Sequence, residues 1–131
     1  MEINSYGERV IPAKSVIRLY QNVGWWEDMK ESEIEDILER TISVGAWIDD
    51  ELVGFARAVS DGKFRAYVED VVVHHQYRRK EIGTHIIERL LHELEHIDII
   101  SLFCDETLIP FYEIEGFRSS SSQYVLHRTK K

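Results

Sequence analysis

The sequence has little cysteine, few basic residues and no long apolar run. Its single cysteine, Cys104, excludes an internal disulfide and is typical of proteins from a reducing compartment. No apolar run approaches the roughly 18 residues of a membrane-spanning helix. The first residues also lack the basic and apolar pattern of a secretion signal. We therefore expect a cytoplasmic protein that has no membrane partner.

Basic residues are outnumbered, with 16 Lys and Arg against 24 Asp and Glu and a formal net charge of −8. This balance argues against nonspecific binding of nucleic acid, because phosphate contacts need a basic face. It is compatible with a cationic substrate. The sequence also lacks the Gly-x-x-x-x-Gly-Lys-Ser/Thr loop of many nucleotide-binding domains.

The length and composition predict one ordinary globular domain over residues 1–131. The chain is 44% hydrophobic and 31% charged, and 131 residues suffice for a single core but not for two. Apart from the four serines at 119–122, we find no repeat, linker or low-complexity segment.

The order of patterns along the chain predicts an α/β fold with a mixed sheet. Ser32 and Glu35 have the spacing of a capping box at the start of a helix. A hairpin follows, and a strand–helix–strand connection implies one parallel pair. The predicted strands are 1–11, 44–48, 52–60, 64–73, 97–104 and 124–127; the predicted helices are 15–24, 32–41, a long one from 82, and 108–114.

The stretch from Ala66 to Leu94 organises the rest of the chain. It begins as a strand rich in valine, passes through a basic loop at 74–80, and continues as a helix with one apolar stripe. A helix start directs backbone N–H groups and a positive dipole end into one small space. The pattern therefore predicts a phosphate-binding site.

Three motifs in this order resemble the GCN5-related N-acetyltransferase (GNAT) superfamily. Arg78-Arg79-Lys80-Glu81-Ile82-Gly83 resembles its Arg/Gln-x-x-Gly-x-Gly/Ala pyrophosphate loop. Phe111-Tyr112-Glu113-Ile114-Glu115-Gly116-Phe117 and Leu52-Val53-Gly54-Phe55-Ala56-Arg57 are similar to two further family segments. The resemblance implies a sheet of about six or seven strands flanked by about four helices. Two parallel strands should splay apart to form an acetyl-CoA cleft.

The resemblance also implies which residues bind acetyl-CoA. The main chain of Val71, Val72 and Val73 would pair with the pantetheine amides and the acetyl carbonyl. The loop residues Arg78, Arg79, Lys80, Glu81, Ile82, Gly83 and Thr84 would hold the diphosphate. Glu81 departs from the family pattern, because a glycine there lets a diphosphate approach the backbone. Asp105 stands where many members carry an asparagine that contacts the cofactor.

Two residues are candidates for proton transfer. Tyr112 matches the family tyrosine that protonates the departing thiolate, although it could also simply pack beneath the cofactor. Glu69 is our candidate base, direct or through water; the alternatives are an electrostatic lure for a cation or a surface residue. In a regular strand Glu69 and Asp70 lie on opposite faces, and a β-bulge would exchange those faces.

The expected function is transfer of an acetyl group from acetyl-CoA to a primary amine of a small molecule or peptide in a ternary complex. The alternative is an acyl-CoA-binding module without turnover. Trp25 and Trp26 either pack in the core or contact the acceptor. Cys104 is expected in a buried strand, and family habit makes a homodimer plausible. The histidines His85, His92 and His96 are expected on a solvated helix face, with no metal bound.

Overall fold

The computed structural model describes residues 1–25, 28–78 and 81–130, and within them a five-stranded sheet in the order β1-β2-β3-β4-β5. The first four strands pair antiparallel, and β4 pairs with β5 in parallel. The strands are β1 (Glu2–Ser5), β2 (Ile42–Ile48), β3 (Glu51–Ser60), β4 (Arg65–Val73) and β5 (Ile99–Leu102). The mixed α/β sheet predicted from the sequence is confirmed, with five strands rather than six or seven.

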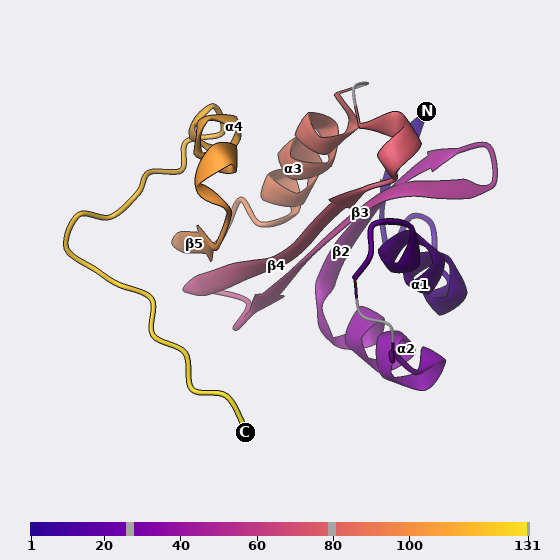
Figure 1. Cartoon of the computed structure of the whole chain (residues 1–131), viewed down its shortest axis with the longest axis horizontal. Helices are drawn as coiled ribbons and strands as arrows, with labels where there is room; N and C mark the ends of the chain where they lie inside the picture. Colours follow the sequence, from indigo (N-terminus) through magenta and orange to yellow (C-terminus); the bar gives the residue numbers. More distant parts are fainter. Residues whose placement is uncertain (26–27, 79–80, 131) are drawn as a thin grey trace.

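Helices cover both faces of this sheet. Figure 1 shows α3 on one side and α1 and α2 on the other, with α4 beyond β5. The helices are α1 (Ala13–Asn22), α2 (Glu31–Arg40), α3 (Ile82–Glu93) and α4 (Ile109–Glu113), with short 3₁₀ turns η1 (His75–Tyr77) and η2 (Glu106–Leu108). Within the described ranges, no helix is long and apolar enough to cross a membrane.

The apolar stripe of α3 packs directly against β3. Ile82, Ile86 and Leu90 are almost completely buried. Their approach depends on Gly54, because a Cβ atom at that position would clash with Ile86 and crowd Ile82. The glycine of the Leu52–Arg57 motif therefore has a packing reason: it lets the helix that follows the basic loop lie against the sheet.

A second core lies beneath α1 and α2. Leu19 and Tyr20 of α1 and Leu38 of α2 are buried against β2 and β3, where Trp47 and Phe55 contribute the largest side chains. The two cores hold the sheet from both sides. The side chains of β4 that point toward either helix layer are therefore held in place by packing.

A β-bulge at Glu69 exchanges the two faces of β4. Arg57 pairs with Asp70, whereas the next residue of β3, Ala58, pairs with Val68, so Glu69 is the extra residue. Before the bulge Val68 belongs to the α3 core; after it Val72 belongs to the α1–α2 core. The parallel pairing between β4 and β5 ends at the same place, with Val68 opposite Leu102.

Several sequence predictions are wrong in detail. β1 ends at Ser5 rather than near residue 11, and α2 is capped two residues earlier than expected, where Glu33 accepts a hydrogen bond from the Lys30 N–H at 3.2 Å. Residues 124–127 form no strand; they are exposed and belong to a C-terminal segment that extends away from α4 (Figure 1). Strand-forming residue types need a neighbouring edge to bond to, and this segment pairs with none in the described structure.

Candidate active site

The main chain of β4 beyond the bulge has one open edge. On its other edge it pairs with β3, where Val71, Val72 and Val73 lie opposite Ala56, Phe55 and Gly54. No described residue of β5 pairs with positions 69–73, because the β4–β5 ladder ends at Val68. N–H and C=O groups on such an edge are available to an extended ligand that carries amides. Two parallel strands that part here form the splayed pair expected from the sequence.

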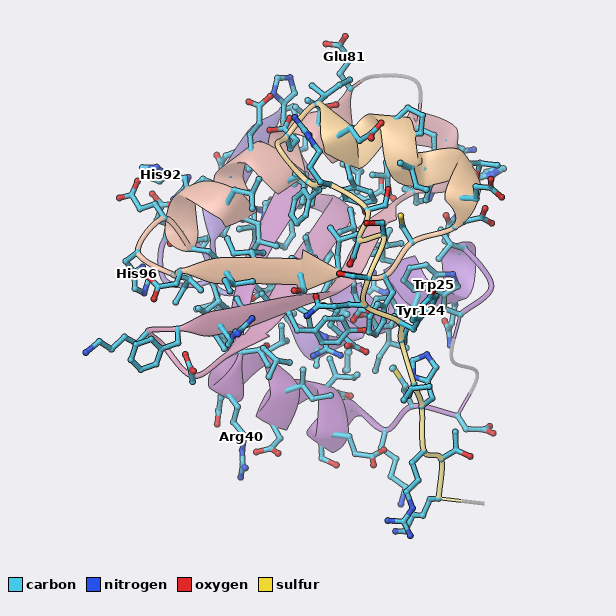
Figure 2. All side chains as sticks on the ribbon, turned by 90° about the vertical axis from the view of Figure 1, so that its left-hand side faces the viewer. Trp25, Arg40, Glu81, His92, His96 and Tyr124 are labelled. Carbon is cyan, nitrogen blue, oxygen red and sulfur yellow. The ribbon has the colours of Figure 1, made fainter. Side chains whose placement is uncertain are left out.

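The open edge leads into the start of α3. Glu81 precedes the helix with φ 59° and ψ 17°, a left-handed conformation that favours glycine. It makes no side-chain capping bond, and Figure 2 shows its side chain pointing away from the molecule. The N–H groups of Ile82, Gly83 and Thr84 lie in the first helical turn, where the helix itself provides no acceptor.

Gly83 lies close to both α4 and the end of β4. A Cβ atom there would lie 3.5 Å from the Phe111 ring and 3.8 Å from a Val73 methyl group. In the loop, Arg78 Nε donates to the Val73 carbonyl at 3.5 Å. Of the cationic loop residues, Arg79 and Lys80 lie outside the described residues, and so does Trp26.

Tyr112 is buried on α4, in contact with Phe111 and Phe117 at ring distances of 4.9 and 5.9 Å. Burial, with a smaller contribution from the nearby Cys104, raises the pKa of its phenol to about 12. Tyr112 also lines a cavity of about 1160 Å³ between β5, α4 and the C-terminal segment. The phenol is therefore a fully protonated weak acid at neutral pH, beside an opening large enough for a ligand.

Asp70 lies at the centre of a buried hydrogen-bond network. Its Oδ2 atom accepts from the Tyr20 hydroxyl and from Arg57 Nε, each at 2.7 Å. The Asp70 side chain is only 8% exposed. Burial and the charge of Asp70 raise the pKa of Tyr20, so this phenol stays protonated. Sequence reasoning missed the network, because it depends on a bulge and on residues 13 and 50 positions away.

Glu69 is half-buried beside that network, with its side chain 30% exposed and 3.9 Å from Arg57. Burial, the charge of Glu69 and a hydrogen bond with it raise the pKa of Tyr67. The Arg57 guanidinium therefore faces the carboxylates of Asp70 and Glu69, and of these two it forms a hydrogen bond only with Asp70. Where β4 and β5 part, Glu69 therefore has a long ion pair with Arg57 and a hydrogen bond with Tyr67, and its partly exposed carboxylate can still accept an ammonium group.

The other predicted residues have more local surroundings. Asp105 caps η2, its Oδ1 accepting from the Thr107 N–H at 3.1 Å and from the Thr107 hydroxyl at 3.2 Å, and its carboxylate lacks the amide donor of an asparagine. Trp25 is partly exposed, and its ring lies 5.8 Å from that of Tyr20. Cys104 is exposed rather than buried, because β5 ends two residues before it.

Of the histidines predicted on the solvated side of the long helix, His85 and His92 lie exposed on α3, whereas His96 lies in the exposed turn just after it. Figure 2 shows His92 and His96 on the surface near the end of this helix, far along it from Glu81. His92 forms an ion pair with Glu95 at 3.5 Å. Among the described residues, no group of three or more His, Cys, Asp or Glu side chains is placed to hold a metal ion.

Known proteins share this architecture. A GNAT family protein from Streptococcus pneumoniae TIGR4 superposes with a TM-score of 0.78 and 24% identity, over 98% of each chain. An aminoglycoside 6'-N-acetyltransferase, solved with coenzyme A bound, superposes with a TM-score of 0.61 and 24% identity, over 72% of this chain and 56% of that one. At this level of identity, the two structures establish a common fold.

Sequence comparison extends the relationship. Serotonin N-acetyltransferase 2 of Oryza sativa subsp. japonica, a chloroplastic protein, is 32% identical over 97 residues, which are 67% of this chain and 48% of that protein. The chain spans less than half the length of such curated relatives. The family model for GNAT acetyltransferases matches residues 13–117. The chain therefore belongs to the acetyltransferase (GNAT) family.

Proposed function

We propose that this chain is an N-acetyltransferase that moves the acetyl group of acetyl-CoA to a primary amine. The observation that carries the proposal is the end of the β4–β5 ladder at Val68, which leaves an open strand edge leading straight to the start of α3. Coenzyme A has a matching layout, because its amide-bearing pantetheine arm would lie along the strand edge and the attached diphosphate would reach the helix start. The solved relative with bound coenzyme A supports the same assignment.

The residues of this edge suit the donor. The main chain of Val71, Val72 and Val73 would bond to the pantetheine amides, and a backbone N–H would polarise the acetyl carbonyl. The first-turn N–H groups of α3, near Gly83, would receive the diphosphate, with Arg78 adding positive charge. Acetyl-CoA supplies an activated thioester, and the protein supplies orientation and proton transfer.

Two side chains would carry out the proton transfers of the reaction. An alkyl ammonium has a pKa of about 10, so the acceptor must lose a proton before its nitrogen can attack. Glu69 would attract the ammonium group and accept that proton, directly or through water. The new C–N bond forms as the C–S bond breaks, and the buried phenol of Tyr112 would protonate the departing sulfur.

The acceptor is proposed to be a cationic amine. The Glu69 side chain is 30% exposed, lies beside Tyr67 and forms a 3.9 Å ion pair with Arg57, so its carboxylate can also accept an ammonium group as a partner. The names of two relatives, one acting on serotonin and one on aminoglycosides, are consistent with amine acceptors of different size. We expect a small amine or a peptide amine.

A second candidate is a module that binds acyl-CoA without turnover. It is favoured by Glu81, because a carboxylate in a left-handed position replaces the glycine of the family loop. Calorimetric titration with acetyl-CoA and free coenzyme A, followed by an amine screen that measures thiol release, separates the candidates. Micromolar binding with amine-dependent thiol release supports the enzyme. Binding without release by any amine supports the module, and no binding contradicts both.

A further inference from the structure

Asp70 is a buried ionisable side chain that the proposed reaction does not use. It is one of two polar residues in the buried set of the described structure, the other being Ser43. A carboxylate in such a place is stable only if it is paired and hydrogen-bonded. Both of its described partners, Tyr20 and Arg57, bond to the same oxygen and come from different elements, α1 and β3.

The position of Asp70 relates it to the open edge. It is the residue immediately after the bulged Glu69, and its pairing with Arg57 is the first rung beyond the bulge. Its bonds to Tyr20 and Arg57 hold it on the α1 side of the sheet. This sets which face of the sheet each following side chain occupies: Val71 and Val73 pack toward α3, and Val72 packs toward α1.

Asp70 also determines where the guanidinium of Arg57 lies. Arg57 Nε is 2.7 Å from Asp70, whereas Arg57 Nη2 is 3.9 Å from Glu69, a long ion pair without a hydrogen bond. Although burial opposes it, Asp70 raises the pKa of Arg57, which therefore stays charged. Were Asp70 neutral, the same guanidinium could turn to Glu69 and form a close ion pair.

We propose that Asp70, anchored by Tyr20, is a positioning residue that holds Arg57 away from Glu69 and so keeps the Glu69 carboxylate available to the acceptor amine. The proposal rests on the proposed function for the role of Glu69. It makes a distinct claim about the chain itself: the competition of two carboxylates for one guanidinium decides whether Glu69 forms a close ion pair with Arg57 or keeps only the long one.

A double-mutant cycle tests this claim. Asp70→Asn keeps the shape and an oxygen acceptor but removes the charge, and we expect kcat/KM for the amine to fall about 10-fold or more. Glu69→Gln should cause a comparable loss. In the double variant, Asp70→Asn should add less than about twofold to the loss from Glu69→Gln, because the group it protects is already gone.

Controls separate positioning from general damage. Asp36→Asn, on the exposed face of α2, changes a carboxylate that pairs with Arg40 rather than Arg57 and should leave the rate unchanged. Acetyl-CoA affinity of Asp70→Asn should stay within about threefold of the wild type, while the amine KM rises. If Asp70→Asn does not fold, Tyr20→Phe retains the Arg57–Asp70 pair and should produce a smaller loss with the same dependence on Glu69.

Additive losses in the cycle, or an unchanged kcat/KM in Asp70→Asn, would overturn the proposal. If the wild type turns over no amine, the proposed function fails, and a crystal structure of Asp70→Asn still decides the positioning claim. Arg57 within hydrogen-bond distance of Glu69 in that structure supports the claim. Arg57 left in its wild-type position contradicts it.

Discussion

The hydroxyl of Tyr20 and the carboxylate of Asp70 are 2.7 Å apart, although 50 residues separate them in sequence. This bond joins the first helix to the strand residue that follows the bulge. It therefore connects the α1–α2 layer, including the neighbouring Trp25 ring, with the open edge of β4. The geometry makes the stability of this region sensitive to the protonation of a buried phenol.

Alkaline pH should destabilise the wild type through Tyr20. Its folded-state pKa is raised above the ordinary value of 10.0, so above pH 10 the unfolded chain binds fewer protons than the folded chain. The free energy of unfolding should then fall by about 1 kcal/mol per pH unit from this group. Denaturant unfolding at pH 8 and pH 11 measures the loss, and Tyr20→Phe should show a correspondingly smaller one. Equal losses in both proteins would contradict the assignment.

Tyr112→Phe should lower kcat by about 100-fold, because the sulfur would lose its proton donor, with little change in acetyl-CoA affinity. Since the pKa of Tyr112 is raised to about 12, this phenol stays protonated, and the wild-type rate should show no decline from its ionisation below about pH 11. Tyr6→Phe, at a tyrosine that does not line the cavity beside Tyr112, is the matched control. Turnover retained in Tyr112→Phe would remove the proton role and leave Tyr112 as a packing residue.

Two variants of Glu81 separate its charge from its conformation. Glu81→Gln removes the negative charge, and Glu81→Gly also relieves the left-handed backbone at φ 59°. If charge opposes the diphosphate, both should bind acetyl-CoA several-fold more tightly, and the gain should shrink at high salt. If conformation matters, only the glycine variant should improve. Calorimetry at two salt concentrations distinguishes these outcomes, and no change in either variant would show that Glu81 does not affect binding.

Gly83 offers a graded test of the diphosphate position. Alanine should be tolerated, because its Cβ would make only ordinary contacts at 3.5 Å or more. A leucine would extend beyond that space beside Phe111 and Val73 and should weaken coenzyme A binding at least about 10-fold. Thermal unfolding of both variants controls for loss of structure. Wild-type affinity in Gly83→Leu would place the diphosphate elsewhere.

Local patterns in the sequence were sufficient to predict most of the elements and the family. The apolar stripe of Ile82, Ile86 and Leu90 appears at helical spacing in the chain and is buried as expected. The loop before it and the motif around Tyr112 predicted the candidate cofactor and proton-transfer residues, and the structure places the Phe111 ring 3.5 Å from where a Cβ of residue 83 would lie. Periodicity and turn chemistry depend on residues close together in the sequence, so they can be recognised before the fold is known.

The environment of Glu69 and Asp70 depends on contacts between elements that are distant in the sequence. One extra residue in β4 exchanges its faces, and whether a bulge forms depends on how β3, β5 and both helix layers pack against the strand. The exposure of Cys104 and of residues 124–127 has the same origin, since a strand lasts only as far as its neighbour pairs with it. Residue types and their spacing show which groups can do chemistry, whereas packing across distant elements sets which of them are buried, paired or accessible.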